Sequence, residues 1–231
     1  KDSPPSADLF EAALREAESY GMSLVALRRL QGLGIEAPES LGQELARREA
    51  AVAFQALRRR ARLEQAIQSL RQRGIPHMAM KGLAQTLTLY QGNASREMLD
   101  IDLLVPPDRE AEARQAIQEL GFQSLSGPAD PDFPHHHHEA PQFDEPSGLI
   151  IEIHREVVPE RVLKSGLAEG FRRRAESVEY AGEVLQVPCR EHRLLHLCLH
   201  LRLHRYLGCL RDVLEIATLV EEEAASWDWG R

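Results

Sequence analysis

The chain has 231 residues and a formal net charge of −8 at pH 7, with 43% hydrophobic and 5% aromatic residues. That length suits one catalytic domain with helical additions, and the acidic balance argues against a general DNA-binding protein. The three cysteines form no disulfide or metal-ligand pattern, and no stretch has the character of a signal peptide or membrane span, so we expect a reducing, cytoplasmic location.

The first third of the chain is predicted to be helical. Apolar residues recur three and four positions apart over Ala7–Ser19 and Ser23–Leu33, and good helix formers fill Ser40–Arg73. Gly74, followed by Pro76, would end the long helix.

One turn of the long helix is strongly basic. It carries Arg58, Arg59, Arg60 and Arg62. The simpler interpretation is a solvated face that makes exposed ion pairs, and the alternative is a surface that docks phosphate or RNA.

A short strand followed by a helix opens the predicted catalytic core. The strand Pro76–Met80 leads through Lys81 and Gly82 into a helix over Leu83–Tyr90. A glycine lets backbone amides approach a ligand closely, and a helix N-terminus offers unpaired N–H groups to a phosphate. Lys81 would add a point charge to that phosphate, unless it is a plain surface lysine at a strand end.

The most informative stretch contains two aspartates on one predicted strand, Asp100 and Asp102. Residues two apart on a strand point to the same side, so these acids project together while Ile101 and Leu103 face the other way. Two carboxylates this close repel one another unless a cation lies between them, and a divalent metal is the natural partner. Arg96, on the preceding loop, would clamp phosphates or brace the carboxylates.

A helix and an irregular segment separate this strand from the next one. The helix is expected over Arg109–Leu120, with a short strand over Phe122–Leu125 after it. The segment Ser126–Gly148 is rich in Pro, Asp, His and Gly and is predicted to be irregular. Its four histidines, His135–His138, are interpreted as a loop, either solvated or lying over the active site. A zinc site is the weaker alternative, since consecutive residues cannot all face one ion.

A third acid lies on a later strand, where Glu152 and His154 share one face and Ile151 and Ile153 the other. If this strand lies beside the aspartate strand, Glu152 reaches the same cation. Three carboxylates on neighbouring strands are the ligands that a two-magnesium phosphoryl or nucleotidyl transfer site needs. Glu152 would hold metal or accept a proton, and His154 would brace an acid or act directly.

The C-terminal third is predicted to be helical after a hairpin. Two short strands over Ser177–Pro188 surround a turn at Ala181-Gly182, and a helical segment follows over Arg190–Glu223, with a turn expected to begin at Arg211-Asp212.

Four histidines at four-residue intervals would form one stripe on this helix. They are His192, His196, His200 and His204. The stripe predicts a metal site, a wall of the active-site cleft with His200 as a possible substrate contact, or ordinary packing. The metal reading is the weakest, because the HxxxH spacing lacks the glutamate of the metalloprotease motif.

These motifs carry a resemblance. A strand, Lys81-Gly82, a helix, Arg96, Asp100-x-Asp102 and a later Glu152 resemble the polymerase-beta-type nucleotidyltransferase superfamily. More narrowly, KG…LY…R…DIDLLV, then LGF, IEIH, HRLLHLCLH and RDVLEIATL, resembles an uncharacterised bacterial nucleotidyltransferase family with KG, DID and E-H motifs, from about residue 74 to the C-terminus. The superfamily usually shows Gly-Ser where this chain has Lys81-Gly82, and the narrower family has the Lys-Gly form.

The resemblance implies an α+β fold: a small mixed β-sheet core over residues 74–160, a helical region over residues 1–73 and a mostly helical region over residues 161–231. It implies metal-dependent transfer of a nucleoside monophosphate from an NTP to a hydroxyl-type acceptor, which is a small molecule, RNA or protein. Two magnesium ions, with manganese as an alternative, would bind the catalytic acids. These acids would be Asp100, Asp102 and Glu152, and the nucleotide would contact Lys81, Gly82 and Arg96.

Two other functions fit the same motifs. One is a catalytically silent binding or regulatory module, such as half of a toxin and antitoxin pair. The other is a phosphotransferase, which would release a nucleoside diphosphate instead of pyrophosphate. In the family, Trp227-Asp228-Trp229 would continue into further helix, so we expect the chain to be truncated.

Overall fold

The computed structural model describes residues 6–19, 22–32, 34–35, 39–90, 98, 100–124, 139–144, 146–159, 166–203 and 210–223. Three helices come first: α1 (Ala7–Ser19), α2 (Ser23–Gly32) and α3 (Glu39–Gln72). The predicted helices are therefore present. Gly74 ends α3 as expected, because its φ of 62° is a left-handed conformation that glycine adopts without strain.

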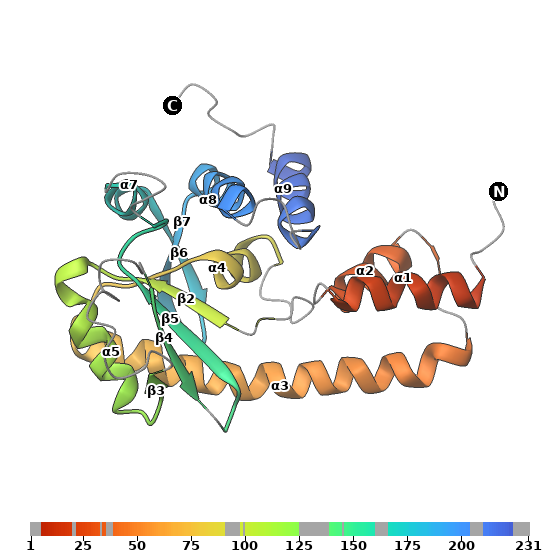
Figure 1. Ribbon diagram of the computed structural model, residues 1–231, viewed down its shortest axis with the longest axis horizontal. Coiled ribbons are helices and arrows are strands. Elements are labelled where there is room, and N and C mark those ends of the chain that lie inside the picture. The colour runs from red at the N-terminus through yellow and green to blue at the C-terminus, as the bar shows by residue number, and fades with distance from the viewer. Residues whose placement is uncertain are drawn as a thin grey trace.

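The 34 residues of α3 connect two hydrophobic cores. In Figure 1, α3 runs along the lower edge of the molecule from α1 and α2 to the sheet. Its first half packs with α1 and α2 around Phe10, Leu14 and Leu27. Its second half belongs to the main core, through residues such as Leu63 and Leu70. The domain boundary predicted at residue 73 stays a prediction. The packing of Leu63 and Leu70 joins the end of α3 to the core of the sheet.

Seven strands form one mixed sheet in the order β3-β4-β5-β2-β1-β7-β6. They are β1 (Met78–Ala79), β2 (Asp100–Leu104), β3 (Gln123–Ser124), β4 (Glu139–Asp144), β5 (Leu149–His154), β6 (Ala175–Tyr180) and β7 (Glu183–Pro188). β2 pairs in parallel with β5, and β1 with β7, whereas the other pairs are antiparallel. The predicted α+β class with a mixed sheet is confirmed.

Helices cover both faces of this sheet (Figure 1). Ile101 and Ile151 point into the main core, which includes the end of α3 and α5 (Glu110–Gln118), the helix after η1 (Pro107–Arg109). On the other face, Leu104 packs with Phe171 of α7 (Leu167–Arg173) and with residues of α8 (Arg190–Leu203). The predicted alternation of β2 and β5 therefore holds, and it leaves the acids on the side of α8.

β4 corrects the prediction of an irregular segment over Ser126–Gly148. Residues Glu139–Asp144 pair along their whole length with β5. Pro141 hid this strand, because proline cannot donate to a ladder. It is tolerated because β3 pairs only with Gln142 and Phe143 on the other side of β4. His135–His138 lie outside the described residues.

The C-terminal third contains one confirmed turn and one correction. The hairpin turns at Ala181 and Gly182, whose φ angles of 56° and 79° suit a two-residue turn. Arg211 and Asp212 do not begin a turn, however. They lie in the first turn of α9 (Leu210–Glu223), where an acid favours helix formation because it faces the positive end of the helix dipole.

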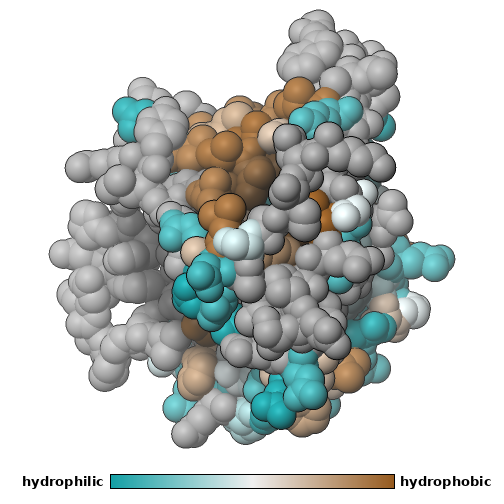
Figure 2. All heavy atoms as spheres, turned by 90° about the vertical axis from the view of Figure 1, so that its right-hand side faces the viewer, coloured by the Kyte–Doolittle hydropathy of each residue, from teal (hydrophilic) through white to brown (hydrophobic). Residues whose placement is uncertain are grey.

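The outer face of α9 is an exposed apolar stripe. Its exposed residues recur at helical spacing: Leu210, Val213, Leu214 and Val220. Figure 2, viewed from the right-hand side of Figure 1, shows apolar side chains gathered in the upper part of the molecule. Among the helices that the structure describes, none is both long and apolar enough to cross a membrane.

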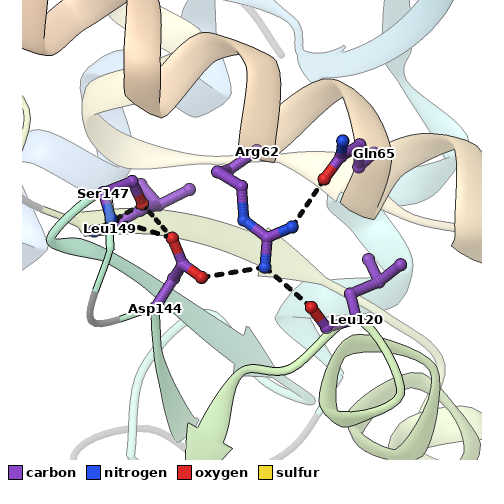
Figure 3. A network of polar contacts seen from close by, with 6 residues as sticks. All are labelled: Arg62, Gln65, Leu120, Asp144, Ser147 and Leu149. Atoms are coloured by element: carbon purple, nitrogen blue, oxygen red, sulfur yellow. Dashed lines mark hydrogen bonds and ion pairs between the residues drawn. The ribbon is translucent and has the colours of Figure 1, made fainter.

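Arg62 joins α3 to the sheet through the network in Figure 3. Its Nη2 lies 2.8 Å from both the Leu120 carbonyl oxygen and Asp144 Oδ1. The Asp144 side chain is 3% exposed and also accepts a hydrogen bond from the Ser147 amide at 3.0 Å. The guanidinium lies over the Phe122 ring, 4.8 Å from its centroid. This arginine of the basic turn therefore has a structural role, and Asp144 fixes the end of β4 to α3.

We expect Arg62→Met to lower the free energy of unfolding by about 3 kcal/mol, because it leaves the buried Asp144 carboxylate without its charge partner. Chemical denaturation followed by circular dichroism measures this. The matched control is Arg58→Met, in the same turn, where the guanidinium lies 6.0 Å from the exposed Phe54 ring. That change should stay within about 0.5 kcal/mol of wild type, and equal losses in both variants would contradict the assignment.

Candidate active site

The parallel pairing of β2 with β5 brings two acids from distant parts of the chain together. Asp102 lies opposite Glu152 in the register, and Leu104 lies opposite His154. The expected adjacency of the two strands is therefore confirmed.

Asp102, Glu152 and His154 form one polar cluster. One candidate ligand atom from each lies within 4.8 Å of the other two. His154 Nε2 is 2.7 Å from Asp102 Oδ1 and 3.4 Å from Glu152 Oε2. The contact to Asp102 is the hydrogen-bonded brace that the strand pattern suggested for His154. Asp100 is exposed and is not part of this cluster, so the structure brings together two of the three predicted acids and adds the histidine.

Lys81 contacts the same two acids. Its Nζ is 2.6 Å from Asp102 Oδ1 and 3.6 Å from Glu152 Oε2. Lys81 is the first residue of α4 (Lys81–Thr88), and its φ of 41° lies in the left-handed region that a non-glycine residue adopts only at a cost. The residue before Lys81 is tied to β2, because the Met80 amide donates a hydrogen bond to the Asp102 carbonyl oxygen at 2.9 Å. The ammonium is thus directed at the acids by an unfavourable backbone conformation.

The electrostatics of the cluster favour an ionised Asp102. Burial by itself raises the pKa of this carboxyl. The Lys81 ammonium and the hydrogen bond to His154 outweigh that effect and hold the pKa well below its usual range. Burial lowers the pKa of His154, and its hydrogen bonds to Asp102 and Glu152 outweigh that effect, so the pKa of His154 is raised. The Asp102 carboxylate therefore lies between the Lys81 ammonium and the His154 ring.

A pocket opens beside this cluster, between α4, α8 and α9. Asp100, Asp102 and Lys81 line it on the catalytic side. The facing wall is formed mainly by Arg193, His196, His200, Arg211, Asp212 and Glu215. Asp100 and Asp102 thus do face a common space, as the strand pattern predicted, although Asp100 lies apart from Glu152.

The histidine stripe divides between this pocket and packing. His196 and His200 line the pocket, as the cleft interpretation predicted. His192 instead stacks on Phe171, with ring centroids 4.3 Å apart, and His204 lies outside the described residues. Among the described residues, no metal-ligand cluster contains a histidine of the stripe.

The structure also shows a pair that the sequence patterns missed. His200 Nδ1 lies 2.8 Å from Asp212 Oδ2, so an acid in the first turn of α9 orients an imidazole on α8. Only the charged residues at the start of RDVLEIATL could have indicated this, and no local spacing connects them with a histidine twelve positions earlier.

Two of the three predicted nucleotide contacts lie among the described residues. Lys81 lies at the acids, and Gly82 is buried in the first turn of α4 and lines the pocket. Arg96 lies outside the described residues. The roles of these residues stay predictions.

The comparisons point to one family. The model of a family described as "Uncharacterised nucleotidyltransferase" matches residues 6–231. No curated protein matches the chain.

Two solved structures are similar to this chain. The solution structure of the antibiotic-resistance factor ANT(2″)-Ia is 13% identical, with a TM-score of 0.53 over 71% of this chain and 84% of that one. A crystal structure of ANT(2″)-Ia in complex with adenylyl-2″-tobramycin is 14% identical, with a TM-score of 0.49 over 71% of this chain and 88% of that one. At this identity the first similarity establishes the shared fold.

We expect His196 to be neutral at physiological pH, because burial, helped by the nearby Lys81, lowers its pKa to about 3. An unfolded histidine takes up its proton near the ordinary value of 6.5. The unfolded chain therefore binds more protons between these values, and His196 makes the fold less stable as the pH falls through that window. NMR titration of the imidazole signals measures this, and a His196 ring that titrates near 6.5 would contradict it.

Proposed function

This chain belongs to the family of uncharacterised nucleotidyltransferases, and we propose that it transfers a nucleoside monophosphate from an NTP to a hydroxyl-type acceptor, with release of pyrophosphate. Membership of that family makes it a transferase enzyme, so the silent regulatory module is set aside. The proposal concerns the residues that act, the metal and the acceptor.

One observation supports the proposal most strongly. Asp102 and Glu152 lie side by side on adjacent parallel strands, and Asp100 and Asp102 face a pocket that holds cationic side chains. Carboxylates and cationic side chains that line one pocket suit a substrate that brings several phosphates and its own counter-ion. A purely structural ion cluster would not need an exposed third acid on the same strand face.

The donor set fits magnesium. Asp100 and Asp102 offer hard carboxylate oxygens toward the pocket, with manganese as an alternative ion. When bound, a divalent cation neutralises charge on the donor phosphates and polarises the reacting phosphoryl group. The sequence predicts two such ions, with Glu152 completing the second site. The position between Asp102 and Glu152 is the one that the Lys81 ammonium approaches.

The donor phosphates would lie in the pocket near the start of α4. Lys81, Arg193 and Arg211 all line this space and can neutralise phosphate charge. Gly82 lies in the first turn of α4 and lines the pocket, and a glycine there lets backbone amides approach a phosphate closely. Arg96 stays a predicted partner of the same phosphates.

The acceptor hydroxyl would approach from the side of α8 and α9. His200 lines the pocket, and Asp212 orients its ring at 2.8 Å. A histidine held by a carboxylate is suited to accept a proton, so we assign His200 to the acceptor and Asp212 to its orientation. Small molecules, RNA and proteins all carry hydroxyl groups and are candidate acceptors. After label from the NTP has been transferred, separation by size shows which class carries it.

We expect Asp102→Asn to lower the rate of nucleotide transfer by at least about a hundredfold, because it removes the buried carboxylate that lies beside Glu152 and lines the pocket. The assay incubates the protein with magnesium, α-labelled NTP and a cell extract, and then measures the label in small molecules, RNA and protein. Asp100→Asn should also lower the rate of transfer. Because Asp100 is exposed, the fold of this variant should be unaffected.

Asp108→Asn is the matched control, because Asp108 is an exposed acid of η1 outside the pocket. It should leave transfer unchanged. Circular dichroism and thermal melting check that each variant is folded. Full transfer by a folded Asp102→Asn variant would end the proposal, and release of a nucleoside diphosphate would favour a phosphotransferase.

A further inference from the structure

We propose that the Lys81 ammonium takes the place of one of the two metal ions, so that a single divalent cation binds together with the nucleotide. The inference rests on the proposed function and deepens it, because it assigns one charge of the active site to the protein itself. It concerns the position between Asp102 and Glu152.

The first observation is where the ammonium lies. Lys81 Nζ is 2.6 Å from Asp102 Oδ1 and 3.6 Å from Glu152 Oε2, the two oxygens that a bridging ion would share. His154 Nε2 approaches the same two atoms, at 2.7 Å and 3.4 Å. Two nitrogen donors therefore satisfy the carboxylates at the boundary between β2 and β5. A metal ion here would have to displace the ammonium.

The second observation is the backbone. Among the described residues, Lys81 and Ala181 are the non-glycine residues with positive φ, and Ala181 belongs to a hairpin turn. A lysine that only reached toward a phosphate from solvent would not need this conformation. The Lys81 side chain is 21% exposed, which limits its freedom to leave. Maintained strain at a charged residue indicates a fixed position for its charge.

The third observation separates the acids into two positions. Asp100 and Asp102 line the pocket, whereas Glu152 is not among its lining residues. An ion that arrives with the triphosphate meets Asp100 and Asp102 first. Glu152 Oε2 lies 3.6 Å from the Lys81 ammonium instead. Asp100 and Asp102 thus offer carboxylates to an ion in the pocket, whereas the Lys81 ammonium holds the position between Asp102 and Glu152.

The chemistry has a consequence for the acceptor. In the reaction, the acceptor oxygen bonds to the α-phosphorus, and the bond from that phosphorus to the bridging oxygen of the leaving pyrophosphate breaks. The hydroxyl proton needs a base, because an ammonium stabilises negative charge but does not ionise a hydroxyl as a bound metal ion does. His200, assigned above to the acceptor, takes that proton.

The test counts metal ions by electron paramagnetic resonance of Mn²⁺, with an α,β-methylene ATP analogue that cannot be cleaved at the reacting bond. Wild-type protein should hold one Mn²⁺ per bound nucleotide, with no spin-coupled pair. Lys81→Gly should hold a second ion and give the coupled signal of two ions about 4 Å apart. Glycine suits the backbone at φ 41°, so this variant is expected to fold.

Two further variants complete the set. Lys81→Met keeps an unbranched side chain without the charge and should also gain the second ion. Arg15→Met removes the same unit of charge from α1, where the Arg15 side chain is 59% exposed, and should hold one ion like the wild type. Thermal melting checks that each variant is folded.

The outcomes separate this inference from the proposed function. A coupled Mn²⁺ pair in the wild-type protein overturns the inference, as does a single ion in both Lys81 variants. If neither the wild-type protein nor any variant binds the nucleotide, the proposed function fails. Titration with Mn²⁺ alone then tests whether the Lys81 ammonium occupies a metal position. In that titration, Mn²⁺ binding about tenfold tighter to Lys81→Gly than to the wild-type protein supports the inference, and equal Mn²⁺ affinity overturns it.

Discussion

The buried carboxylate of Asp102 is the constraint on which the site depends. This side chain is 2% exposed, and an ionised carboxylate is costly there unless cations and hydrogen-bond donors surround it. Lys81, the first residue of α4, and His154 from β5 meet that requirement. β1 leads toward Lys81, β2 carries Asp102 and β5 carries His154, and the adjacency of these strands in the sheet brings the three groups to one place.

The rest of the fold holds this arrangement steady and leaves it open on one side. One face of β2 and β5 is buried against α3 and α5, so the acids can only face the other way. The network around Arg62 and Asp144 ties the end of β4 to α3, and β4 in turn pairs with β5 along its length. α8 and α9 close the remaining side with the wall that carries His200 and Asp212. The pocket lies between β2, α4 and the helix pair α8 and α9.

Local patterns were enough to predict much of this structure. Alternation along β2 and β5 predicted which residues are buried and which acids share a face, and the residues Ala181-Gly182 predicted the hairpin turn. That Glu152 reaches Asp102 was conditional on the two strands being neighbours, which the structure supplies. Other features depend on contacts between distant segments. β4 contains Pro141 and becomes a strand only because β5 pairs with it. Lys81 could not be assigned to the acids from its sequence position, because its direction depends on an unusual φ angle. Likewise, the strand pattern could not show that Asp100 lies outside the cluster of Asp102, Glu152 and His154.

The central claim is that the acids of β2 and β5 transfer a nucleotide, and the fate of the phosphates of an NTP tests it most directly. The measurement follows an NTP that carries one label on the α-phosphate and another on the γ-phosphate, with wild-type protein and Glu152→Gln. The account predicts that wild-type protein moves the α-label to an acceptor and releases the γ-label as pyrophosphate, and that Glu152→Gln does neither. Transfer of the γ-label to the acceptor, or equal pyrophosphate release by Glu152→Gln, would contradict it.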